Sequence, residues 1–60
     1  MMTLKLIAGT WYVTCEDFKA LFDTDTIPTP YRATIGAEVV RREIARLNPT
    51  ETVIVERSAA

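Results

Sequence analysis

Two aspartates, Asp23 and Asp25, stand one residue apart in the stretch DTDTIPTPYRAT. Paired carboxylates can attack phosphorus and move a proton in a phosphotransfer loop, or hold a cation. The phosphotransfer motif needs threonine at its fifth position, where Ile27 stands, and a much larger doubly wound domain. A calcium loop needs glycine at its sixth position and a carboxylate at its twelfth, where Pro28 and Thr34 stand. We therefore interpret the stretch as a polar turn followed by a connector.

Cys15 is the only cysteine, and the chain contains no histidine. An internal disulfide is therefore excluded, and the usual zinc ligand sets cannot be assembled from one chain. A nucleophilic Cys15 would lack a base, and Glu16 and Asp17 oppose a thiolate. The single serine, Ser58, belongs to the tail. We expect a packing cysteine, no enzyme activity, no metal and no cofactor.

Four arginines lie in or just before the second predicted helix: Arg32, Arg41, Arg42 and Arg46. A basic helix face can bind phosphates. Glu38 and Glu43, however, precede arginines by four and three residues, which is the spacing of ordinary ion pairs on a helix surface. The sequence favours a solvated face and leaves a nucleic-acid interface as the alternative.

Length and composition describe one small domain covering residues 1–60. A chain of this size buries only about 60% of the surface that its unfolded form exposes, so good packing or a partner chain must support it. The hydrophobic fraction of 48% suits a folded domain, and a net charge of -1 supplies no field for nucleic acid or an anionic membrane. We find no signal peptide and no membrane span, and we expect a cytoplasmic protein.

The elements that position these residues begin with a β-hairpin. Alternation over Thr3–Ile7, the turn AGT and the β-rich run TWYVT predict two strands. Near the other end, TVIVER predicts a strand with Val53 and Val55 on one face.

Two amphipathic helices are predicted between these strands. The first is CEDFKALFD, opened by Thr14 as N-cap, with a core-facing side formed by Phe18, Leu21 and Phe22. The second is GAEVVRREIARLN, with Thr34 as N-cap and a stop at Asn48–Pro49. Its apolar stripe consists of Ala37, Val40, Ile44 and Leu47.

Between the helices, the stretch IPTPYR predicts a rigid connector. Pro28 and Pro30 would keep it from joining the sheet, with Ile27 and Tyr31 holding it to the core. The alternative is a polyproline II segment offered to an aromatic groove. We expect a small two-layer α+β domain, β-β-α-α-β, with two helices packed on one face of a three-stranded sheet.

Trp11 and Tyr12 are adjacent in a strand and must point to opposite faces. If the helices cover Trp11, then Tyr12 lies on the uncovered face with Lys5, Ile7 and Ile54. That apolar area exceeds what a monomer comfortably exposes, which indicates a partner surface or a homodimer.

The first functional hypothesis is therefore a non-catalytic accessory or inhibitory protein that binds another protein or itself, including through a sheet edge. The second is a small nucleic-acid-binding regulator that uses the arginine face. In scale, though in no motif, the chain resembles small proteins of phages and mobile elements such as anti-CRISPR proteins. The predicted partner-binding residues are Tyr12, Tyr31, Arg32, Arg41 and Arg46.

Overall fold

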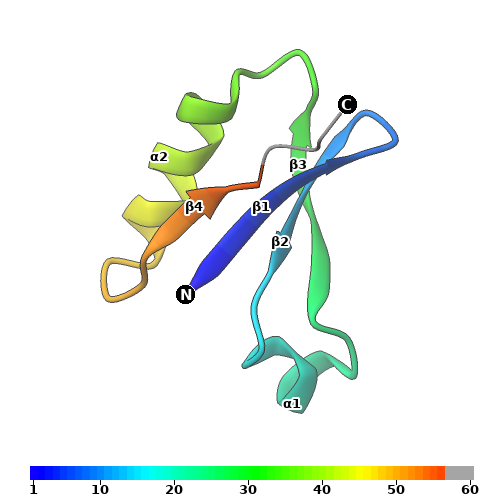
Figure 1. Ribbon diagram of the computed structural model, residues 1–60, viewed down its shortest axis with the longest axis vertical. Helices are drawn as coiled ribbons and strands as arrows, with labels where there is room; N and C mark the ends of the chain where they lie inside the picture. The colour runs from blue at the N-terminus through cyan, green and yellow to red at the C-terminus, as the bar shows by residue number, and fades with distance from the viewer. Residues whose placement is uncertain (57–60) are drawn as a thin grey trace.

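The computed structural model describes residues 1–56, so Ser58 lies outside the described residues (Figure 1). It contains a small α+β domain with a mixed four-stranded sheet and two helices. In chain order the elements are β1 (Met2–Ile7), β2 (Thr10–Thr14), α1 (Phe18–Phe22), β3 (Thr26–Arg32), α2 (Ala37–Leu47) and β4 (Val53–Val55).

The predicted hairpin is present as β1 and β2, which pair antiparallel from Thr3↔Thr14 to Ile7↔Thr10. Its loop has two residues, Ala8 and Gly9, with φ of 48° and 80°. Positive φ at both central positions matches the right-handed twist of the flanking strands, although it is unfavourable for a residue with a Cβ such as Ala8.

The prediction that the proline-containing stretch stays out of the sheet is wrong. Thr26–Arg32 forms β3, and the sheet has four strands in the order β3-β2-β1-β4 instead of three. Pro28 pairs with Tyr12, flanked by the pair Ile27↔Val13. The Cys15 N–H donates to the Asp25 carbonyl at 2.9 Å, so with a period of two Pro28 turns its missing N–H position to the outer side of an edge strand, where no ladder bond is lost. Pro30 lies where the pairing of β2 and β3 shifts in register, between Tyr12↔Pro28 and Thr10↔Arg32.

The second predicted helix is confirmed as α2, which buries Val40 and Ile44 against the sheet. Its N-cap is Gly36, without a side-chain cap bond, so the prediction of Thr34 is wrong. Leu47, predicted to lie in the apolar stripe, is exposed near the end of the helix. There Asn48 closes the last turn, since its Nδ2 donates to the Ile44 carbonyl at 2.9 Å.

The first predicted helix is shorter than expected and does not share the core. α1 spans only Phe18–Phe22, its N-cap is Asp17 instead of Thr14, and it contains no buried residue. Phe18 is partly buried, but Leu21 and Phe22 are exposed, so the predicted core face is wrong. Figure 1 shows the reason: α1 lies beyond the end of β2 and β3, where the sheet offers no surface to cover.

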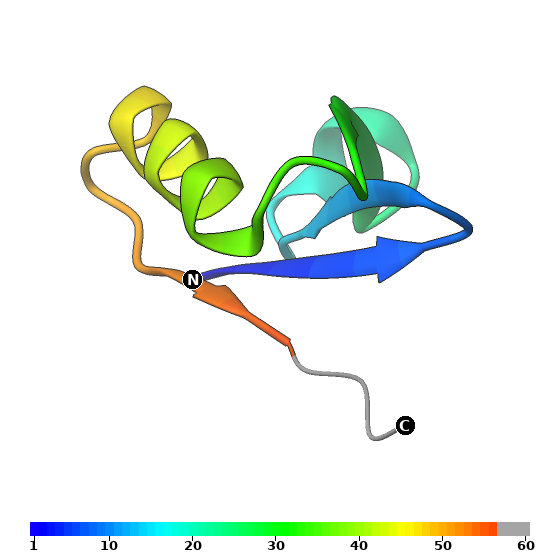
Figure 2. The same cartoon turned by 90° about the horizontal axis from the view of Figure 1, so that it is seen from above.

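A single hydrophobic core fills the space between α2 and the sheet. Leu4 and Val40 are fully buried at its centre, and Cys15 is buried within the cluster. Trp11 closes one end, where its Nε1 donates to the Ile35 carbonyl at 3.0 Å. Figure 2 shows α2 above the β1–β4 side of the sheet and α1 on the β2–β3 side. Among residues 1–56, no helix is long and apolar enough to cross a membrane.

Candidate interaction surface

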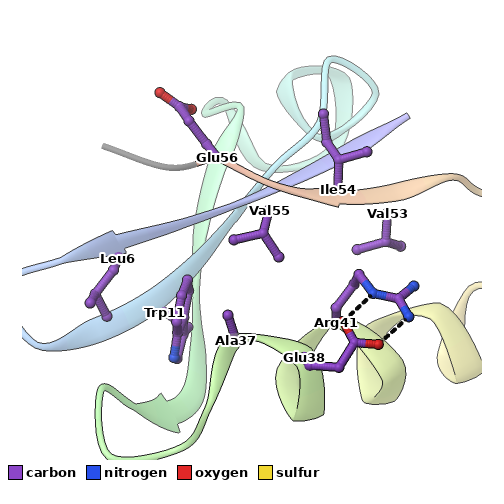
Figure 3. Close-up of a pocket in the computed structure, with 9 residues that line it drawn as sticks. All are labelled: Leu6, Trp11, Ala37, Glu38, Arg41, Val53, Ile54, Val55 and Glu56. Carbon is purple, nitrogen blue, oxygen red and sulfur yellow. Dashed lines mark hydrogen bonds and ion pairs between the residues drawn. The ribbon is translucent and has the colours of Figure 1, made fainter. Parts of the chain in front are cut away.

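A groove of about 730 Å³ runs between β4 and the first turns of α2. Its apolar walls are Leu6, Trp11, Ala37, Val53 and Val55. Figure 3 shows Val53 and Val55 pointing toward α2, while Ile54 points to the other side of the sheet. The groove therefore presents apolar side chains along one face of an edge strand.

The backbone of β4 has one paired side and one open side. β4 runs parallel to β1, and the Met2 N–H donates to the Thr52 carbonyl at 2.8 Å while the Glu56 N–H donates to the Leu4 carbonyl at 2.9 Å. The alternation of a parallel ladder then turns the N–H and C=O groups of Val53 and Val55 outward. Since β4 is the last strand of the sheet, these groups face the open edge.

The opposite edge of the sheet is closed to pairing. β3 carries Pro28 and Pro30, which offer no N–H to an incoming strand. Prolines on an edge strand are a common protection against unwanted pairing between sheets. Among residues 1–56, β4 is therefore the sheet edge whose outward positions, Val53 and Val55, keep their N–H groups.

Two ion pairs border the groove. Glu38 and Arg41 form a two-point contact in which Nε donates to Oε2 at 2.9 Å, and Lys5 Nζ lies 3.4 Å from Glu56 Oε2. The Arg41 hydrogen bond lowers the pKa of the Glu38 carboxyl below its ordinary value, and the same bond raises the pKa of Arg41. Both residues therefore stay charged at neutral pH and form a polar rim.

The five predicted partner-binding residues do not come together in one place. Tyr12 lies opposite Lys5 and Pro28 on the face that α2 leaves open, which confirms that it points away from the buried Trp11. Tyr31 is partly buried against the core, and Arg32 is exposed at the end of β3.

Of the other two predicted partner residues, Arg41 borders the β4 groove, and Arg46 lies near the far end of α2. Nη2 of Arg46 lies 2.8 Å from Glu43 Oε2, and this bond lowers the pKa of the Glu43 carboxyl. The predicted helix-surface ion pairs are therefore present.

The open face of the sheet is more polar than the sequence suggested. Ile7 and Ile54 are exposed there, but threonines lie among them, with Thr14 Oγ1 and Thr26 Oγ1 3.2 Å apart. Sequence reasoning missed the groove lined by Leu6 because that groove exists only where β4 returns beside β1. The alternation in TVIVER indicates that Val53 and Val55 share one apolar side of a strand, but it does not indicate that this strand lies at the edge of the sheet.

One group within residues 1–56 has donor atoms close enough to hold a metal ion. The ligand atoms of Cys15, Asp17 and Glu51 lie within 4.8 Å of one another. Glu51 Oε2 already accepts a hydrogen bond from the Met1 ammonium at 3.4 Å, and Cys15 Sγ lies 4.0 Å from Glu51 Oε1. Within this cluster, the Glu51 carboxylate therefore already has two partners, the Met1 ammonium and the Cys15 thiol.

Comparisons with protein-family models, curated proteins and solved structures found no match to this chain.

Proposed function

We propose that this chain is a non-catalytic interaction protein that binds an extended segment of a partner protein as an added strand beside β4. The observation that carries the proposal is the outward backbone of Val53 and Val55 next to an apolar groove. Strand addition combines main-chain hydrogen bonds, which supply affinity, with pockets for alternate side chains, which supply specificity.

The geometry indicates the kind of segment that fits. Because side chains alternate along a strand, every second residue of the added strand would point toward the groove lined by Leu6, Trp11 and Val55. Those residues should be apolar. The residues between them would lie on the side of Ile54 and meet the sheet face that carries Lys5 and threonines. We expect a ligand with alternating apolar and polar side chains and no proline opposite Val53 or Val55.

Binding of this kind suits an accessory or inhibitory protein, because a partner segment that is paired with β4 is held in one conformation and is blocked from other contacts. The nucleic-acid alternative has less support from the arginines. Arg41, Arg42 and Arg46 each lie within 4.0 Å of a helix carboxylate, Glu38 or Glu43. Phosphate binding would have to compete with those pairs.

The proposal is tested by selecting binders from a library of random linear peptides and measuring their affinity for matched variants. Leu6 and Ile7 are neighbours on β1, 48% and 44% exposed, but only Leu6 lines the β4 groove. Leu6→Glu should weaken selected peptides by about tenfold or more, equivalent to about 1.4 kcal/mol, because it places a charge in the apolar groove. Ile7→Glu is the control and should leave the affinity unchanged.

Val55→Pro is the second variant, because it removes an outward N–H and leaves the β1–β4 ladder bonds in place. It should also abolish binding while circular dichroism remains that of the wild type. The proposal is wrong if no peptide is selected, or if Ile7→Glu weakens binding as much as Leu6→Glu.

A further inference from the structure

The half of the sheet that α2 does not cover has its own apolar groove, of about 250 Å³. It lies between β3, α1 and the last turns of α2, and its walls include Phe18, Ile27, Tyr31, Ile44 and Leu47. This groove is separate from the β4 edge. We call it the β3–α2 groove.

Beside the β3–α2 groove stands an apolar projection formed by α1. Leu21 is 76% exposed and Phe22 is 58% exposed, whereas Leu47 on the opposite wall is 60% exposed. The Phe22 ring packs edge to face against the Phe18 ring, with centroids 6.0 Å apart at 79°. One surface of the molecule therefore presents both an apolar projection and an apolar groove.

The charges on this surface have opposite signs on its two sides. The segment around α1 carries four acidic residues, Glu16, Asp17, Asp23 and Asp25, against one basic residue, Lys19, which makes a local charge of about -3 within a chain of net charge -1. On α2, three arginines outnumber the two glutamates that pair with them, Glu38 and Glu43, which makes a local charge of about +1. A second copy turned by a two-fold rotation would bring each acidic segment toward the other copy's arginines.

We propose that the β3–α2 groove binds α1 of a second copy, so that the protein forms a two-fold symmetric dimer. A surface that holds both halves of a contact is self-complementary, as an isologous interface requires. Leu21, Phe22 and Leu47 each leave on the order of 100 Å² of apolar surface in water. Six such side chains supply on the order of 600 Å², so we expect an interface of the weak, transient class that forms at high protein concentration.

This inference does not depend on the proposed function. The two-fold contact uses α1, β3 and the end of α2, whereas strand addition uses β4 and the start of α2. The dimer leaves both β4 edges outside the contact, so either proposal can fail without the other.

The experiment is sedimentation equilibrium over a wide range of concentrations on the wild type and four further samples. The wild type should reach twice the 6.7 kDa mass of one chain. Leu21→Arg and Leu47→Glu should each raise the dimer dissociation constant by about tenfold or more, since each places a charge in the contact. Val39→Arg changes an exposed apolar residue of α2 outside the groove and should have no effect.

The fourth sample, an equimolar mixture of Leu21→Arg and Leu47→Glu, gives the sharpest result. In the mixed dimer, the arginine introduced in α1 of one chain meets the glutamate introduced in α2 of the other, and the second half of the contact keeps the native leucines. The mixture should therefore form a dimer with a lower dissociation constant than either variant alone. A control circular dichroism spectrum for each variant shows that the fold is retained.

Three outcomes would overturn the inference: a wild type that stays at the mass of one chain at every concentration, no recovery in the mixture, or equal weakening by Val39→Arg. A dimer that Val55→Pro abolishes and Leu21→Arg leaves intact would also overturn it, and would place self-association at the β4 edge.

Discussion

The two halves of the sheet's core face differ in how completely they are covered. Under α2, Leu4 and Val40 are fully buried. Beside α1, Leu21 and Phe22 stay in water, and the β3–α2 groove remains open. Both helices carry apolar residues at helical spacing, so the pattern alone does not explain the difference.

Helix length and position explain it. α2 has 11 residues and extends about 16 Å, enough to lie along the sheet. α1 has 5 residues, a little more than one turn, and lies beyond the end of β2 and β3 (Figure 1). An amphipathic stripe stabilises a fold only where a second apolar surface lies opposite it.

The two sheet edges also differ, because one is closed and the other is open. β3 carries two prolines, which offer no N–H to an incoming strand, whereas β4 presents the outward backbone of Val53 and Val55. The covered half therefore has the open edge, and the uncovered half has the closed edge. Two different modes of association follow, strand addition at β4 and side-chain packing at the β3–α2 groove.

The largest expected effect comes from making the same substitution in both halves. Leu4→Ala should lower the free energy of unfolding by about 2–5 kcal/mol, because it leaves a cavity in the closed core. Leu21→Ala should change it by no more than about 0.5 kcal/mol, because its side chain is mainly in water. Urea unfolding at a concentration where the protein is a monomer measures both. Equal losses would show that α1 is as well packed as α2.

A smaller effect is expected at the end of the covered half. Trp11→Phe removes the Nε1 hydrogen bond to Ile35 and leaves its carbonyl without that donor. The free energy of unfolding should fall by about 1–3 kcal/mol. Amide hydrogen exchange should show faster opening at the start of α2 than at its end, since Ile35 precedes the helix. Uniform acceleration along α2 would contradict a local role for this bond.

The smallest effect concerns the charged rim of α2. The hydrogen bond from Arg41 lowers the pKa of Glu38 from its ordinary value of 4.5, so the pair stabilises the fold above that pH. The contribution is lost as the pH falls through the lowered pKa of the folded state. Glu38→Gln should therefore lower Tm slightly at neutral pH and not at about pH 2, where the glutamate and the glutamine that replaces it are both neutral.

Thermal unfolding of the wild type and Glu38→Gln at both pH values measures this effect. A difference in Tm that persists in acid would assign it to helix propensity instead of charge. The α1 segment has no comparable ion pair among the described residues, so we expect no acid-dependent change in stability from α1 of the kind expected from α2.

Sequence patterns predicted the α+β class, the hairpin, α2 and the last strand. Each of these depends on local periodicity and on the residues that end an element, Gly9 in the hairpin turn and Pro49 after α2. The fourth strand could not be predicted from the assumption that proline excludes pairing. A proline prevents pairing only on the side of the strand that its nitrogen faces, and the other side can still pair. Which side faces a neighbouring strand depends on the tertiary structure.

The candidate surface could be predicted only in its parts. Arg41, Trp11 and the pair Val53 and Val55 each stood out in the sequence for a different reason. Their meeting in one groove depends on the parallel return of β4 beside β1, across about 50 residues of chain. Local patterns contain no information on which strand becomes the edge.

By itself, the sequence determined which residues are apolar, which segments are helical or extended, and which chemistries lack their side chains, because these properties belong to single residues and short periods. Only the tertiary structure decided that α2 finds a partner surface and α1 does not, and that β3 closes one edge while β4 leaves the other open. Burial and edge position are relations between distant segments, so they exist only once the chain has folded.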